Sequence, residues 1–172
     1  MAQRHTLVRG DEGFPRPVLA FLAAYAAGAW LFYATLVGEQ SNHLALTRVM
    51  WPLALSGLAT LTATMAVITG ALAGSSIRCL LLLTAVTLSL LVTVFSLLYW
   101  TYGTSENFSQ CLSKWDAVYF ALGTLTTAGT GNLMAISDLA KALASVQLVV
   151  DLVFMGGAVA LVVARLGARA DN

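Results

Sequence analysis

Four long apolar runs constrain this chain more than any other feature of its sequence. They are residues 17–37, 49–73, 80–102 and 139–164. A bilayer with a hydrocarbon core of about 30 Å needs about 20 apolar residues per spanning helix, and every run is long enough. Only 10% of the residues are charged, whereas soluble domains carry about one quarter. The sequence therefore predicts an all-α membrane protein with four spanning helices.

Basic residues next to these runs predict how the helices are oriented. They are Arg4, Arg9 and Arg16 before the first run, Arg78 between the second and third, and Arg165 and Arg169 after the fourth. Because basic flanks stay in the cytoplasm, both termini are expected inside, with residues 39–47 and 103–138 outside. The first run exceeds the apolar length of a signal peptide, about 7–15 residues, so we expect it to be retained. The net charge of +1, without a basic patch, gives no indication of a nucleic-acid partner.

Turn-forming residues divide the chain into four parts. We expect a cytoplasmic tail over residues 1–16, a transmembrane helical hairpin over 17–76, a second membrane unit over 77–166 and a cytoplasmic tail over 167–172. The hairpin carries no recognisable chemistry, and its small residues suit close helix packing. No run contains repeated arginine, so a voltage-sensing helix is not expected. Cys79 and Cys111 fall on opposite membrane faces in this topology and are not expected to pair.

A short apolar stretch, residues 117–125, lies between the third and fourth runs and is too short to cross the bilayer. Ser113 followed three residues later by Asp116 is a capping-box pattern, which predicts a helix that begins near Lys114. We expect this half-helix to enter the membrane from outside and to return as non-helical backbone. Such backbone exists at membrane depth only where protein buries it or where it lines a wet path.

The returning segment resembles the selectivity filter of the potassium-channel pore family. It reads Thr126-Thr127-Ala128-Gly129-Thr130-Gly131-Asn132, where the family has Thr-Thr-Val-Gly-Tyr-Gly-Asp after a short pore helix. Residues 116–120 also match the start of the pore helix, and residues 137–141 match the start of the inner helix. The likeness covers residues 80–164, roughly half of the chain. It implies a homotetrameric potassium channel in a cell membrane, with residues 77–166 as its pore domain. Such a protein is not an enzyme, and K⁺ is its permeant ion rather than a cofactor.

By this resemblance, the ion-binding residues are Thr127, Ala128, Gly129, Thr130 and Gly131. A potassium filter replaces the hydration shell of the ion with rings of backbone carbonyls that face one axis. Consecutive carbonyls face one way only if the backbone alternates between conformations, some with positive φ, which glycine adopts without steric cost. The alternative interpretation is that Gly129 and Gly131 form an ordinary tight loop or permit close helix packing.

Three positions depart from the family's filter: Ala128 replaces Val, Thr130 replaces the aromatic residue and Asn132 replaces Asp. In the family the aromatic ring packs against the pore helix and the Asp bonds to it. Thr130 is too small for that packing, and Gly123 offers no acidic partner, although Tyr119 can still pack behind the filter. Two interpretations therefore stay open beside a potassium channel, namely a non-selective monovalent cation channel and a non-conducting scaffold subunit. An intramembrane hydrolase is disfavoured because the runs lack a Ser-His, paired-Asp or His-Glu constellation.

Asp151 is the only acidic residue deep within an apolar run. A carboxylate near the bilayer centre costs at least about 2.5–3.5 kcal/mol, so its side chain is expected to face water or a partner rather than lipid. One interpretation is that four copies ring the upper cavity of the pore and concentrate cations there. The other is structural, with Asp151 bonded to a group such as Gln147 one turn earlier. Gly156 and Gly157 in the same run are interpreted either as a hinge or as a site of close helix packing.

Overall fold

The structure of the chain is a computed structural model that describes residues 16–35, 43–72 and 77–170. Within these residues there are five helices and no strand. The helices are α1 (Arg16–Thr35), α2 (His43–Leu72), α3 (Ile77–Tyr102), α4 (Lys114–Leu125) and α5 (Asp138–Ala170). They confirm the predicted all-α class. Residues 1–15 of the expected N-terminal tail, both connections of the hairpin and residues 171–172 lie outside the described residues, whereas the expected C-terminal tail is helical as far as Ala170.

Two of the described helices are long and apolar enough to cross a membrane. They are α3, with a mean hydropathy of 2.4, and the Asp138–Ala164 part of α5, with a mean hydropathy of 2.3. The helices α1 and α2 contain shorter apolar segments, Leu19–Leu31 and Ala54–Gly70. By length and composition, α3 and α5 are therefore the candidates among the described helices for crossing a membrane, and the count of four spans stays a prediction.

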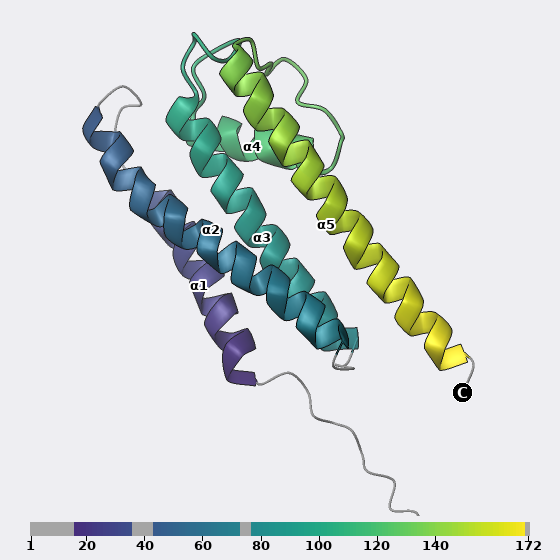
Figure 1. The fold of residues 1–172 in the computed structure, drawn as a ribbon. Helices are drawn as coiled ribbons and strands as arrows, with labels where there is room; N and C mark the ends of the chain where they lie inside the picture. The colour runs from purple at the N-terminus through teal and green to yellow at the C-terminus, as the bar shows by residue number, and fades with distance from the viewer. Residues whose placement is uncertain (1–15, 36–42, 73–76, 171–172) are drawn as a thin grey trace, which may run out of the picture.

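Helix α3 lies between the other long helices (Figure 1). The helices α1 and α2 pack along one side of it, and α5 runs beside it in the opposite direction. The short α4 lies across one end of α3 and α5, which we call the loop end because it carries residues 103–113 and 126–137. Cys79 lies in the first turn of α3 and Cys111 lies in the loop after its last turn, so the two cysteines are at opposite ends of this helix.

Buried aromatic rings at the loop end hold α4 against α3. The ring of Tyr99 meets the rings of Phe120 and Phe108 edge to face, at centroid distances of 4.8 and 6.0 Å. The rings of Phe108 and Phe120 are 5.3 Å apart. Each such pair contributes about 0.5–1.5 kcal/mol beyond the burial of its area. Because these rings come from α3, α4 and the loop between them, α4 cannot move without disturbing all three.

The two loops at this end are bonded to each other. Phe108 and Ala135 form an isolated antiparallel bridge, and Ser109 N donates a hydrogen bond to Met134 O at 2.9 Å. One loop precedes α4, and the other follows the candidate filter. Their pairing therefore ties together the segments on either side of α4.

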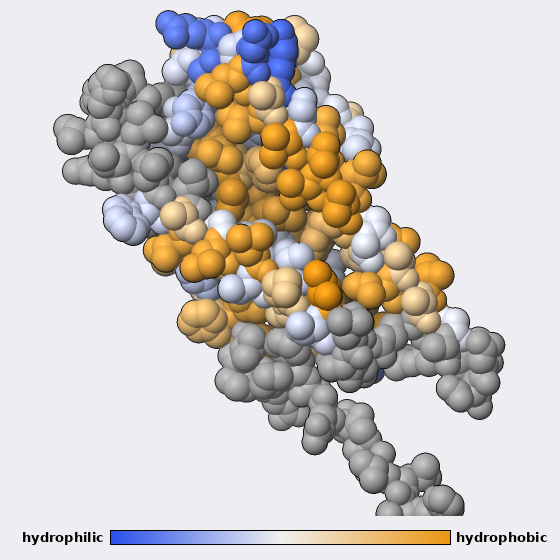
Figure 2. Space-filling view, in the orientation of Figure 1, coloured by the Kyte–Doolittle hydropathy of each residue, from blue (hydrophilic) through white to orange (hydrophobic). Residues whose placement is uncertain are grey.

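The visible surface is apolar along the helices and hydrophilic at the loop end (Figure 2). On α5, for example, the Leu152 side chain is 74% exposed in a single chain. Apolar surface of this extent belongs against lipid or against other protein chains.

Candidate functional site

Helix α4 begins where the capping box predicted. The Ser113 hydroxyl accepts a hydrogen bond from Asp116 N at 3.1 Å, and the Asp116 carboxylate accepts one from Ser113 N at 2.9 Å. The first helical residue is Lys114, as the sequence predicted. These two bonds satisfy amide groups that the N-terminus of a helix otherwise leaves unpaired.

Helix α1 holds the same end of α4. The Tyr33 hydroxyl donates to Lys114 O at 2.8 Å, and the Lys114 ammonium donates to Ala34 O at 3.3 Å. That ammonium also lies 5.4 Å from the centroid of the Trp100 ring, within the range of a cation–π contact. Tyr33 and Lys114 are 81 residues apart, so no local sequence pattern indicates their contact. The N-terminal hairpin thus has a structural role at this site that sequence reasoning missed.

The backbone after α4 alternates in conformation. Positive φ occurs at Thr127 (54°), Gly129 (85°) and Gly131 (60°). The two glycines confirm the prediction that these positions need left-handed backbone. Thr127 was not expected among them, because a β-branched residue rarely adopts positive φ and the strain costs about 1–3 kcal/mol. Every second residue from 127 to 131 is therefore left-handed.

The candidate filter has one open side and one packed side. Thr127, Ala128 and Gly129 are exposed, Thr130 is half-buried, and Leu133 is only 3% exposed. A Cβ built on Gly129 would meet no atom within 4 Å. Non-helical backbone at membrane depth needs protein or water beside it. The open side is thus free to face water or further protein chains.

The Gly129 carbonyl lies close to α4. A Cβ built on Gly123 of α4 would lie 2.8 Å from Gly129 O and 3.3 Å from Gly129 C. The oxygen is the nearer of the two atoms, so this carbonyl tilts toward α4. In the sequence, Gly123 was notable only because it cannot provide an acidic partner for the filter. In the structure it is a point of direct contact between α4 and the filter.

A turn at Thr130 closes the filter. The Thr130 hydroxyl donates to Leu133 O at 2.6 Å, and Leu133 N donates to Thr130 O at 3.1 Å. Thr130 therefore holds the loop by hydrogen bonding where the resembling family uses an aromatic ring. Beyond the turn, the Ser109 hydroxyl donates to Asn132 O at 2.9 Å and accepts from Met134 N at 3.1 Å. Sequence reasoning missed Ser109, because it lies in the loop before α4.

A buried glutamine joins three helices behind the filter. The Gln147 side chain on α5 is 1% exposed. Its carbonyl accepts a hydrogen bond from the Tyr99 hydroxyl of α3 at 2.7 Å, and its amide donates to Ala121 O of α4 at 2.9 Å. A polar residue in an apolar run is a sequence signal, but the signal does not name the partners. These bonds fix α4 relative to both long helices.

Asp151 is buried in the structure. Its side chain is 3% exposed, and neither carboxyl oxygen has a hydrogen-bond partner among the described residues. Gln147, one turn earlier, donates to Ala121 O at 2.9 Å, and its side chain also interacts with the Asp151 carboxyl group. Asp151 is therefore buried within its own chain, and its place in the upper cavity of a pore stays a prediction.

The other expected residues lie in more open positions. Tyr119 is 52% exposed, and its hydroxyl is 3.8 Å from where a Cβ of Gly131 would stand. It therefore lies near the last part of the filter. A Cβ at Gly156 or Gly157 would meet no atom within 4 Å. Neither glycine of the expected hinge is thus needed for packing within one chain.

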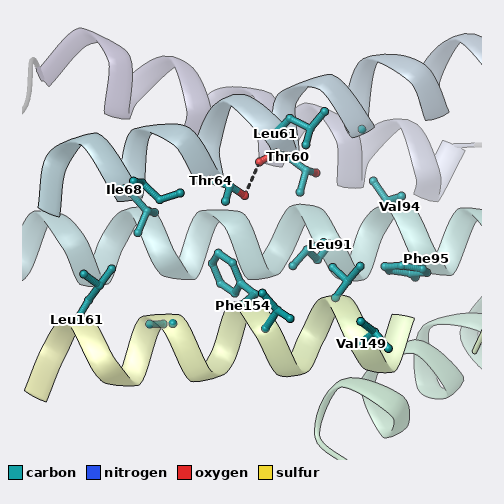
Figure 3. A pocket seen from close by; sticks show the side chains of 16 residues that line it. Thr60, Leu61, Thr64, Ile68, Leu91, Val94, Phe95, Val149, Phe154 and Leu161 are labelled. Carbon is teal, nitrogen blue, oxygen red and sulfur yellow. Dashed lines mark hydrogen bonds between the residues drawn. The ribbon is translucent and has the colours of Figure 1, made fainter. Parts of the chain in front are cut away.

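An apolar cavity of about 720 Å³ lies away from the filter, between α2, α3 and α5 (Figure 3). Leu61, Phe95 and Phe154 are among the side chains that line it. The hydroxyls of Thr60 and Thr64, which also line it, donate to carbonyls one turn earlier in α2 at 2.7 and 2.8 Å. The described lining residues therefore suit apolar groups and not an ion.

A family model described as "Ion channel" matches residues 79–168, just over half of the chain. The matched segment starts in the first turn of α3, contains α4 and the candidate filter, and ends in the last turn of α5. It leaves α1 and α2 outside. No curated protein and no solved structure matches the chain.

Proposed function

The chain belongs to the ion channel family, and from this premise we propose that it conducts K⁺ through a filter formed by residues 127–131 of four copies. The alternating positive φ at Thr127, Gly129 and Gly131 carries the proposal. It occurs in a loop that follows a capped half-helix and leaves one side open. An ordinary tight turn has no use for three left-handed residues at alternate positions, one of them a threonine.

In this proposal, backbone carbonyls replace the water around a dehydrated K⁺ ion. They belong to Thr127, Ala128, Gly129, Thr130 and Gly131. The Gly129 carbonyl turns from α4 toward the ion path when an ion binds, and a residue without a side chain offers little steric resistance to that rotation. The C-terminal end of α4 directs the negative end of its dipole toward the same path.

The surfaces left open in one chain support assembly into a homotetramer. Helix α4 exposes Trp115 (80%), Tyr119 (52%) and Leu122 (43%) along one stripe, and the open filter loop follows it directly. Lipid can cover apolar side chains, but it cannot satisfy the polar groups of non-helical backbone. Four copies around one axis, as the family resemblance implies, would cover this stripe and enclose the ion path.

The proposed location is a cell membrane, with α1, α2, α3 and α5 all spanning it. Arg78 precedes the apolar part of α3, and Arg165 and Arg169 follow that of α5. The positive-inside rule then supports cytoplasmic termini. In this orientation the loop end faces outward, so the filter opens to the outside of the cell.

A non-selective cation channel is the second candidate, and the support of the filter favours it. The half-buried Thr130 contributes a hydrogen bond to Leu133 O and a methyl group near Gly123. An aromatic ring would fill more space between the filter and α4 and would restrict its width more firmly. Discrimination between K⁺ and Na⁺ depends on the size and stiffness of the carbonyl cage.

Ion flux from liposomes that contain only the purified protein tests the proposal. Vesicles loaded with K⁺ should lose it when diluted into K⁺-free medium. Gly129→Ala should reduce this flux at least about tenfold, because a β-carbon in left-handed backbone costs about 1–2 kcal/mol in each of four copies. Gly57→Ala is the matched control and should leave flux unchanged, since its Cβ would meet no atom within 4 Å.

The outcomes separate the candidates. Equal passage of K⁺ and Na⁺ would favour the non-selective channel. Vesicles that pass neither ion would contradict both channel proposals and favour a scaffold subunit.

A further inference from the structure

Because Gly123 has no side chain, the filter backbone can lie close against α4 at this position. A Cβ built on this buried glycine would stand 2.8 Å from Gly129 O and 2.9 Å from the Thr130 Cγ2 methyl. Real side chains do not approach other heavy atoms that closely, so even alanine would force its neighbours to move. Gly123 is not among the glycines with positive φ. Its helical backbone suits any residue, and glycine in a helix interior costs about 1 kcal/mol relative to alanine. Space, and not backbone conformation, therefore requires glycine here.

Thr130 supplies the opposite side of this contact. Its methyl group is the side-chain atom nearest to the place where a Cβ of Gly123 would stand. Its hydroxyl donates a hydrogen bond to Leu133 O at 2.6 Å. The hydroxyl thus fixes the rotation of the side chain, and the methyl fills part of the space above Gly123.

If this space were filled, the filter would move and α4 would not. Helix α4 is held by the ring of Phe120 in the aromatic core, by Gln147 at Ala121 O and by the capping box at Ser113. The filter, in contrast, has an open side. A β-carbon at Gly123 would therefore displace the filter backbone away from α4 and toward the ion path.

We propose that Gly123 and Thr130 form a size-matched contact that sets the distance between the filter and α4, which makes Gly123 a positioning residue for ion selectivity. This inference rests on the proposed function, because it assigns selectivity to a residue that touches no ion. In a ring of four copies, displacement of the backbone from α4 narrows the path. A narrower ring of carbonyls favours Na⁺, the smaller ion, over K⁺.

Four proteins in liposomes test the contact: wild type, Gly123→Ala, Thr130→Ser and the double variant. Thr130→Ser removes the methyl group and keeps the hydroxyl that bonds Leu133 O. The double variant moves one methyl from one side of the contact to the other, so it conserves volume. We expect Gly123→Ala to lower the K⁺ to Na⁺ permeability ratio at least about fivefold. The double variant should recover part of this loss, because Thr130→Ser removes the methyl 2.9 Å from the new Cβ while Gly129 O remains 2.8 Å from it.

Thermal unfolding of the same proteins tests the contact apart from conduction. Gly123→Ala should lower the Tm, and the double variant should recover part of the loss. Gly57→Ala should not fall below wild type, because its Cβ meets no atom and alanine favours a helix interior. An unchanged permeability ratio in assembled Gly123→Ala protein would overturn the selectivity role. A double variant whose effects simply add would overturn the size-matched contact. A wild type that passes no K⁺ would instead overturn the proposed function and the selectivity role together, and the unfolding data would then decide the contact alone.

Discussion

Helices α3 and α5 are almost equally hydrophobic but differ sharply in what covers them. Each contains an 18-residue apolar window, with mean hydropathies of 2.4 and 2.3, yet 56% of the α3 window is buried within the chain and only 11% of the α5 window. The other helices surround α3, whereas α5 lies at the edge of the subunit (Figure 1). Hydropathy alone therefore does not distinguish a helix that supports its own subunit from one that is free to meet other chains.

Polar residues make the distinction that hydropathy does not. Among the described residues of α5, only Ala140, Gln147 and Asp151 are buried, and two of these are polar. In lipid there is no hydrophobic force between helices, so close packing and polar contacts hold them together. The polar residues of α5 thus mark the face toward its own subunit. The apolar face is left for lipid and for further copies.

Among the substitutions that test this difference between α3 and α5, Gln147→Leu should have the largest effect on stability. Gln147→Leu leaves the buried Tyr99 hydroxyl without its acceptor and removes the bond to Ala121 O. We expect the free energy of unfolding to fall by about 2–4 kcal/mol, since each buried group left unpaired costs about 1–3 kcal/mol. Val146→Leu, at a neighbouring position that is 55% exposed, is the control and should change it by less than about 0.5 kcal/mol. Equal stability of the two variants in denaturant titrations would show that the polar stripe does not hold α5.

Truncation of the apolar face of α5 should weaken assembly instead. The paired change Leu152→Ala and Val159→Ala removes side chains that are 74% and 59% exposed in one chain. We expect the dissociation constant of the proposed tetramer to rise at least about tenfold, equivalent to about 1.4 kcal/mol. The matched pair Leu58→Ala and Met65→Ala on α2, at 60% and 59% exposure, should leave it unchanged. Cross-linking across a dilution series measures both, and equal weakening by the two pairs would contradict the role given to α5.

A smaller effect is expected where α1 contacts the start of α4. Tyr33→Phe removes only the hydrogen bond to Lys114 O, which should lower the free energy of unfolding by about 0.5–1.5 kcal/mol. Tyr119→Phe, at a half-exposed tyrosine of α4, should have no measurable effect on unfolding. If Tyr33→Phe also leaves the free energy of unfolding unchanged, the hairpin does not support α4 through this bond.

Asp151→Asn should have the smallest effect on ion conduction. The carboxyl group is buried toward its own subunit, so removal of its charge should leave single-channel conductance, rectification and the response to internal Mg²⁺ unchanged. Because burial of a charged carboxyl group is costly, the variant should be at least as stable as wild type. Reduced inward rectification in the variant would return Asp151 to the ion path.

Local patterns in the sequence predicted the parts of the site that depend on neighbours along the chain. The capping box of Ser113 and Asp116 predicted the start of α4, and the spacing of Gly129 and Gly131 predicted their positive φ. These signals arise within a few residues, because caps and left-handed backbone have strong residue preferences.

Contacts between distant segments were not predictable in the same way. Tyr33 reaches Lys114 across 81 residues, and Gln147 reaches Ala121 across 26. The direction in which Asp151 points depends on the rotation of α5 against α3 and α4, which apolar residues on nearly every face of the helix do not specify. The close approach at Gly123 likewise requires the path of the filter backbone, and no sequence pattern contains it.

The reversal potential of the reconstituted protein tests the central claim most directly. With K⁺ on one side of a bilayer and an equal concentration of Na⁺ on the other, a potassium-selective filter should shift this potential by about 60 mV for each tenfold preference for K⁺. We expect a shift toward the K⁺ equilibrium potential that Gly57→Ala retains and Gly123→Ala reduces. A reversal potential near zero for the wild type would contradict potassium selectivity, and the absence of any current would contradict conduction through residues 127–131.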